Sequence, residues 1–154
     1  MVTVKQKTVV TQKMTGESKS HSLTEVKCRD VSSLIDEPAE RGGTNKGLTP
    51  TETLMSSLVG CTNVIFHKAA HANGVNVHAL NIRLETQFDR RGVTLQEEIA
   101  VPFPKITMYL DLKTDADDAK IAEAKRQLNM YCPVAKVFRA SGSELEEVWT
   151  IQRP

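Results

Sequence analysis

The chain has 154 residues, of which 40% are hydrophobic and 25% charged, and its formal net charge is +1 at pH 7. This composition excludes a disordered chain, and the length predicts a single compact domain over residues 1–154. The near-zero net charge excludes a global electrostatic field that would attract nucleic acid or an anionic membrane surface.

The sequence offers no signal for a membrane or a secretory pathway. No stretch reaches the roughly 20 apolar residues that a bilayer requires, and the N-terminus lacks the apolar core of a signal peptide. The three cysteines, Cys28, Cys61 and Cys132, include no CxxC pair and are too few for the disulfide framework of a small secreted protein. A cytoplasmic location with free thiols is expected.

The N-terminal third predicts β-structure followed by a long loop. Apolar residues alternate with polar ones from Val2 to Met14, Gly16 breaks the pattern, and a β-branched run follows over residues 21–28. This order indicates strand, turn, strand. Residues 36–50 are dense in Gly, Pro, Asn and Thr without periodicity, which predicts a long surface loop of a kind that is often functional.

A long helix is predicted to begin at Pro50. Thr49 is its N-cap, Pro50 takes the first helical position, and Glu52 completes a capping box with Thr49. The helix runs for about six turns to the pair Asn73 and Gly74, which is typical of a left-handed C-terminal cap. Its apolar stripe, formed by Leu54, Leu58 and Ile65, also carries Cys61.

The C-terminal half predicts two strands, two helices and a closing strand. Residues 79–88 and 106–112 alternate as half-buried strands. Residues 115–130 form an amphipathic helix that is rich in Ala and charged side chains. The pair Cys132-Pro133 interrupts it, a short helix restarts over 134–140, and residues 144–151 form the last strand.

Each thiol has its own sequence context. Cys61 lies on an apolar helix face, where a free cysteine alone indicates a small buried hydrophobe. Cys132 directly precedes Pro133, so it can cap the short helix with its sulfur near unpaired backbone N–H groups, a position that favours the thiolate. Cys28 ends a polar strand and nothing else singles it out.

Other motifs for chemistry are weak. His67 and His71 are four residues apart on the long helix, a spacing that suits zinc, but no HExxH glutamate and no obvious third ligand accompany them. A solvated or interface-facing pair is the alternative, and no metal is expected. The chain has no phosphate-binding glycine loop and no GxSxG elbow.

Two segments together resemble a known family. The segment GLTPTETLMSSLVGC over residues 47–61, with Pro50 eleven residues before Cys61, is the first mark. The segment YCPVAKVF over residues 131–138, with Cys132 inside Cys-Pro-Val, is the second. Together they resemble the OsmC/Ohr family of stress-induced thiol peroxidases, and the predicted element order agrees over essentially the whole chain.

The resemblance implies an OsmC-like α+β fold with two long central helices backed by β-sheet, and an intertwined homodimer with active sites at the subunit interface. It implies that Cys61 attacks the peroxide and becomes a sulfenic acid, and that Cys132 condenses with it to a disulfide. A thiolate nucleophile and a nearby resolving thiol suit this chemistry, and a dithiol reductant restores the pair by exchange. No metal or organic cofactor is implied.

The chain departs from the family pattern at two positions. The hydroperoxide branch has Glu directly after the helix-starting Pro, whereas this chain has Thr51 there and Glu52 one residue later, turned by about 100° on the helix. Glu52 matches the Pro-x-Glu pattern of less characterised members, with the capping box as its alternative role. The family's thiolate-stabilising Arg comes from an early strand, but residues 1–28 contain no Arg.

Arg41 and Arg29 are the candidate replacements for that cation. Since Cys61 lies in mid-helix among apolar neighbours, a stabilised thiolate needs a local positive charge. The loop is expected to bring Arg41 towards Glu52, so that the carboxylate orients the guanidinium beside Cys61. A solvated Arg41 is the alternative.

Three functions follow from these patterns. The first is a thiol-dependent peroxidase that reduces hydroperoxides, organic ones in particular, through a Cys61–Cys132 disulfide. The second is a redox sensor or small-molecule binding protein on the same fold without turnover, favoured by the missing early Arg. The third is a structural or metal-binding module that uses His67 and His71.

Overall fold

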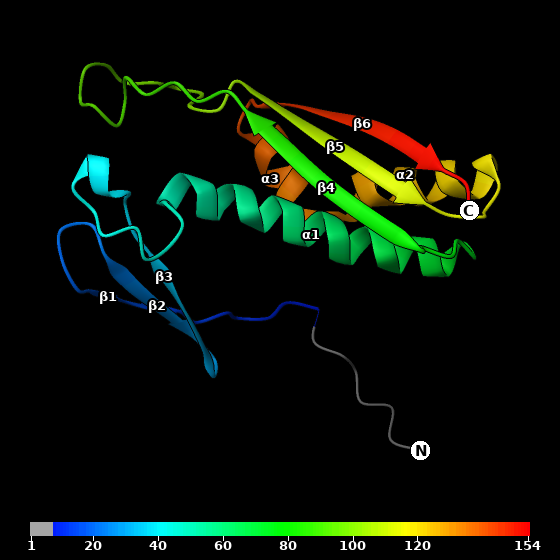
Figure 1. Cartoon of the computed structure of the whole chain (residues 1–154), viewed down its shortest axis with the longest axis horizontal. Coiled ribbons are helices and arrows are strands. Elements are labelled where there is room, and N and C mark those ends of the chain that lie inside the picture. Colours follow the sequence, from blue (N-terminus) through cyan, green and yellow to red (C-terminus); the bar gives the residue numbers. More distant parts are fainter. Residues whose placement is uncertain (1–7) are drawn as a thin grey trace. The chain divides into compact units, whose positions relative to one another are not determined.

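The computed structural model describes residues 8–154, shown in Figure 1. The chain forms two compact units, one ending at Leu54 and one covering Met55–Pro154. No helix in the described part of the chain is long and apolar enough to cross a membrane.

The first unit contains a three-stranded antiparallel sheet in the order β1-β2-β3. Its strands are β1 (Thr15–Ser18), β2 (Thr24–Cys28) and β3 (Val31–Ile35).

The sequence-based prediction for this region is partly wrong. Residues 8–14 form no strand, and Gly16 pairs with Val26 inside β1 where a break was expected. The strand β3 was not predicted because its sequence, VSSLI, does not alternate. The expected alternation at residues 1–7 lies outside the described residues.

The predicted loop over residues 36–50 is present, and a buried carboxylate organises it. It contains a short 3-10 helix, η1 (Ala39–Arg41). Asp36 is fully buried and accepts hydrogen bonds from the Thr44 hydroxyl at 2.6 Å and from the backbone N–H groups of Glu37, Thr44 and Lys46. These donors hold the pKa of Asp36 well below its usual range.

Two glycines let this loop close on itself. A Cβ on Gly43 would lie 1.8 Å from the carbonyl oxygen of Glu37, and one on Gly47 would lie 2.1 Å from that of Leu34. Both contacts are far inside van der Waals distance, so only glycine fits at these positions.

The second unit follows the predicted order. It contains α1 (Pro50–Ala72, whose first turn precedes the unit), β4 (Ala79–Thr86), β5 (Lys105–Lys113), α2 (Asp118–Tyr131), α3 (Pro133–Ala140) and β6 (Glu144–Gln152). The start of α1 at Pro50 and the left-handed Gly74 after its end, at φ 65°, are confirmed. The helix α2 begins three residues later than predicted, because the Asp117 side chain accepts the Lys120 N–H and acts as the N-cap.

The second sheet has the order β4-β5-β6, with β4 antiparallel and β6 parallel to β5 (Figure 1). Alternate residues of β5 are buried: Ile106, Met108, Leu110 and Leu112. They form one core with Leu58 and Phe66 of α1, Leu128 of α2 and Phe138 of α3. The helices therefore cover one face of this sheet.

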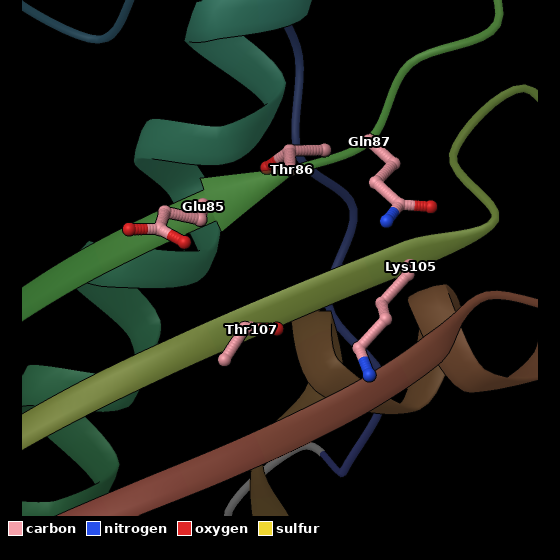
Figure 2. A pocket seen from close by; sticks show the side chains of 5 residues that line it. All are labelled: Glu85, Thr86, Gln87, Lys105 and Thr107. Carbon is pink, nitrogen blue, oxygen red and sulfur yellow. The ribbon is translucent and has the colours of Figure 1, made fainter.

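The other face of this sheet is polar. Figure 2 shows a hollow on it, lined by Glu85, Thr86, Gln87, Lys105 and Thr107. The Lys105 ammonium lies 3.1 Å from Glu146 and 3.4 Å from Glu144 on the neighbouring strand. No cysteine lines this hollow, and neither does Glu52 or Arg41. The candidate site residues from the sequence therefore lie outside it.

Candidate dithiol site

Two thiols from distant parts of the sequence meet inside the second unit. Cys61 lies in α1 and is half-buried, and Cys132 lies between α2 and α3 and is fully buried. Their Sγ atoms are 3.3 Å apart, with the Cys132 thiol donating to Cys61. Both are free, and a disulfide would require the sulfurs to approach by roughly 1.2 Å. The predicted proximity of these two thiols is confirmed.

Cys132 caps α3, as its position before Pro133 predicted. Its Sγ accepts the Ala135 N–H at 3.5 Å, and its own N–H closes the end of α2 on Leu128. The expected preference for the thiolate is wrong, however. Burial raises the pKa of the Cys132 thiol, and the Ala135 N–H offsets this only in part. Burial therefore favours the protonated form of the Cys132 thiol.

Cys61 is the more accessible of the two sulfurs, since it is only half-buried. The next residue, Thr62, is fully buried and donates a hydrogen bond to the sulfur of Met108 on β5 at 3.4 Å. Beyond it, Ile65 and Tyr131 line a hollow of about 250 Å³ between α1 and α2, together with Lys68, Ala69 and Gln127. Ile65 is one turn after Cys61, and Tyr131 directly precedes Cys132. Neither thiol is among the residues that line this hollow.

Glu52 forms the predicted capping box. Its carboxylate accepts the Thr49 N–H at 2.8 Å, and its own N–H donates to the Thr49 hydroxyl at 3.2 Å. The Thr49 contacts are the main reason why the pKa of Glu52 lies below its ordinary value. The capping role, given as the alternative from the sequence, is therefore present.

Arg41 is engaged mainly by Glu37, with Nε 2.8 Å from its carboxylate. Its charge also contributes, as the smallest of the causes, to the lowered pKa of Glu52. The other candidate cation, Arg29, sits in the tight turn between β2 and β3 at φ 56°, with a largely exposed side chain 3.9 Å from Asp30. Neither arginine is a free guanidinium.

The remaining sequence candidates do not assemble a site. His67 and His71 are both exposed, and the His67 ring contacts the Asn63 carbonyl oxygen at 2.9 Å. Over residues 8–154, no group of three or more His, Cys, Asp or Glu side chains could hold a metal ion. Cys28 ends β2 in the first unit.

One residue that bridges α2, α3 and β6 was missed from the sequence. Glu147 lies on the inward face of β6, where its side chain is 11% exposed. The signal was present in ELEEVWTI, because the alternation that turns Leu145, Trp149 and Ile151 inward also turns Glu147 inward. A charged residue at such a position stands out only when the register is known.

The chain matches the model of the family described as OsmC-like protein over residues 43–147, which is more than half of its length. No curated protein matches the sequence. The solved OsmC-like protein from Mycoplasma pneumoniae is 14% identical with a TM-score of 0.72, and the match covers 94% of this chain and 97% of that one.

Two further solved structures carry functional names. The organic hydroperoxide resistance protein OsmC from Legionella pneumophila is 12% identical with a TM-score of 0.63, covering 95% of this chain and 99% of that one. The organic hydroperoxide resistance protein OhrB of Bacillus subtilis is 18% identical with a TM-score of 0.59, covering 92% and 98%. At these identities the likeness is one of fold.

Proposed function

This chain belongs to the family of OsmC-like proteins, and on that premise we propose that it is a thiol-dependent peroxidase that reduces organic hydroperoxides. The observation that carries the proposal is the 3.3 Å separation of two free sulfurs that lie 71 residues apart in sequence. The names of the Legionella and Bacillus structures, both organic hydroperoxide resistance proteins, agree with this substrate class.

The first step assigns the attack to Cys61. Its thiolate attacks the terminal oxygen of the hydroperoxide and displaces the alkoxide, so that the O–O bond breaks and an S–O bond forms. The products are the Cys61 sulfenic acid and an alkoxide, which takes up a proton to become the alcohol. Burial and a raised pKa keep Cys132 out of this step, since the thiolate is the nucleophile.

The second step assigns resolution to Cys132. Its sulfur attacks the sulfenic sulfur of Cys61, an S–S bond forms, and the hydroxyl group leaves as water with the Cys132 proton. The close sulfurs favour this step over further oxidation by a second hydroperoxide. A dithiol then reduces the disulfide through a mixed disulfide and is itself oxidised. The proposal uses no metal and no organic cofactor.

Glu52 and Arg41 remain part of the proposal as the charged groups that would support the Cys61 thiolate. Arg41→Ala should then slow oxidation of Cys61 by hydroperoxide, and Glu52→Gln should do so more weakly. An Arg41→Ala variant that reacts as fast as the wild type removes this pair from the mechanism.

We also propose that the chain acts as a homodimer. Val64 of α1, Tyr131 at the end of α2 and Val137 of α3 are large hydrophobic side chains exposed by 49%, 61% and 66%. A second copy that covered them would remove this apolar surface from water.

The decisive experiment adds cumene hydroperoxide and a dithiol reductant to the reduced protein. A peroxidase consumes many equivalents of hydroperoxide, and Cys61→Ser abolishes this consumption. The second candidate, a redox sensor without turnover, is favoured by the engagement of Arg41 with Glu37. A sensor would consume a single equivalent and stop.

A further inference from the structure

The last strand carries a carboxylate, Glu147, on the face that turns towards the helices, where it borders an open hollow together with Asn129 and Arg139. The residues of β6 that turn inward are Leu145, Glu147, Trp149 and Ile151. Glu147 pairs in register with Met108 of β5, which is 1% exposed. The Glu147 side chain is 11% exposed, and a carboxylate so far withdrawn from water costs free energy unless it is hydrogen-bonded. The partners of Glu147 therefore indicate why a carboxylate is there.

Those partners come from three elements. One carboxylate oxygen of Glu147 lies 3.5 Å from the Arg139 guanidinium of α3. The other accepts the Asn129 side-chain N–H at 3.3 Å and the Trp149 indole N–H at 3.0 Å. Arg139 also donates to the Asn129 side-chain oxygen. The carboxylate thus joins the last turn of α2 and the last turn of α3 to β6.

Cys132 lies in the chain segment between two of these partners, three residues after Asn129 and seven before Arg139. The network also reaches the other thiol-bearing helix. The Trp149 ring packs on Phe66 with centroids 5.0 Å apart, and Phe66 follows Cys61 on α1 by five residues. Side chains near Cys61 on α1 and near Cys132 on α2 and α3 therefore contact the same strand, β6.

We propose that Glu147 is a positioning residue that holds Cys132 within reach of Cys61 by tying Asn129 and Arg139 to β6. The inference rests on the proposed function for its role in turnover. In the resolving step the Cys132 sulfur must approach the Cys61 sulfenic sulfur as the S–S bond forms and water leaves. If the junction of α2 and α3 is less rigid, Cys132 samples more positions, and its sulfur is less often within reach of the Cys61 sulfenic sulfur. The first step, at Cys61 alone, is unaffected.

The first test measures the stability of the Cys61–Cys132 disulfide in glutathione buffers, which requires no peroxidase activity. Glu147→Gln keeps the shape of the side chain and removes its charge. We expect its equilibrium constant for disulfide formation to fall by about tenfold. The matched control is Glu146→Gln, which removes a charge from an exposed ion pair with Lys105 on the other face. It should stay within about twofold of the wild type.

The second test separates positioning from a general loss of stability. With one equivalent of cumene hydroperoxide, Glu147→Gln should form the sulfenic acid at the wild-type rate and the disulfide about tenfold more slowly. Equal slowing of both steps, or a lower melting temperature with both steps unchanged, overturns the inference. Arg139→Gln breaks the network from α3 and should reproduce the split, so it replaces Glu147→Gln if that variant does not fold.

The outcomes distinguish the two proposals. Wild-type protein that forms the disulfide in glutathione but consumes no hydroperoxide contradicts the proposed function, while the glutathione comparison still decides the role of Glu147. Wild-type turnover together with an unaltered Glu147→Gln variant contradicts the inference alone. A wild-type chain that forms no Cys61–Cys132 disulfide in glutathione contradicts the inference directly.

Discussion

At the scale of single residues, the two thiols differ in what surrounds them. Cys61 is half-buried, whereas Cys132 is fully buried and has a raised pKa because of that burial. A fully buried sulfur is harder for a hydroperoxide to reach, which favours attack by Cys61 first. The environment of each sulfur thus supports the order of attack that the family resemblance implied.

Substitution of each thiol should therefore have different consequences. Cys61→Ser should abolish hydroperoxide consumption. Cys132→Ser should allow one oxidation, after which the stranded sulfenic acid proceeds to sulfinic acid. Mass spectrometry of the intact protein after graded hydroperoxide checks both, with Cys28→Ser as the control that should behave like the wild type. If the first oxidation by hydroperoxide still occurs in Cys61→Ser and is lost in Cys132→Ser, then Cys132 is the attacking thiol and Cys61 the resolving one.

The Glu52 carboxylate makes a pH-dependent contribution to stability. Its pKa is lowered in the folded chain, chiefly by the Thr49 N–H. Folding therefore gains stability from ionised Glu52 above its unfolded pKa of about 4.3, and loses it as the pH falls through the lowered folded value. Glu52→Gln should lower the melting temperature at pH 7 and have little effect at strongly acidic pH. An equal effect at both pH values would contradict this account.

At the scale of elements, the start of α1 depends on one side chain. Thr49 is 4% exposed, and its hydroxyl accepts the Glu52 N–H. Thr49→Ala leaves that helix N–H unpaired and should cost about 1 kcal/mol of unfolding free energy in urea titration. Thr49→Ser keeps the hydroxyl and is the control, which should lose much less. Equal losses would assign the effect to the methyl group instead of the cap.

The α2–α3 corner illustrates how one element boundary serves two purposes. Pro133 ends any continuation of α2, and Cys132 before it caps α3 through the Ala135 N–H. Cys132, the single residue between the two helices, is thus also the residue whose sulfur contacts Cys61. The position of the second thiol follows from the same local rule that divides the two helices.

At the scale of the whole molecule, the proposed dimer makes a prediction about α1. Val64 is 49% exposed on this helix, and a charge there would be buried in an interface that covers it. Val64→Asp should therefore shift the protein towards monomer in light scattering coupled to size-exclusion chromatography. The control is Val93→Asp in the β4–β5 connection, where Val93 is 63% exposed. Unchanged assembly in Val64→Asp would exclude α1 from the interface.

The two compact units, one ending at Leu54 and the other beginning at Met55, bear on the domain assignment. The sequence predicted a single domain over residues 1–154, and this stays a prediction, as does the cytoplasmic location. The first unit contains Glu52 and Arg41, and the second contains both thiols of the candidate site.

Local rules in the sequence determined most of the second unit. The capping box at Thr49 set the start of α1, alternation set β4, β5 and β6, and Cys132-Pro133 set the boundary between α2 and α3. Each depends on neighbours in the chain, so it can be read from the sequence. The first sheet was partly mispredicted because β3 does not alternate.

The sequence also determined the family and, through two motifs, which two thiols lie close together. Only the tertiary structure decided the state of Cys132, since burial by distant elements outweighs the local N–H donor that favours its thiolate. It likewise decided which side chains hydrogen-bond and pair with Glu147. Burial and charge pairing depend on residues that are remote in sequence, so local patterns cannot specify them.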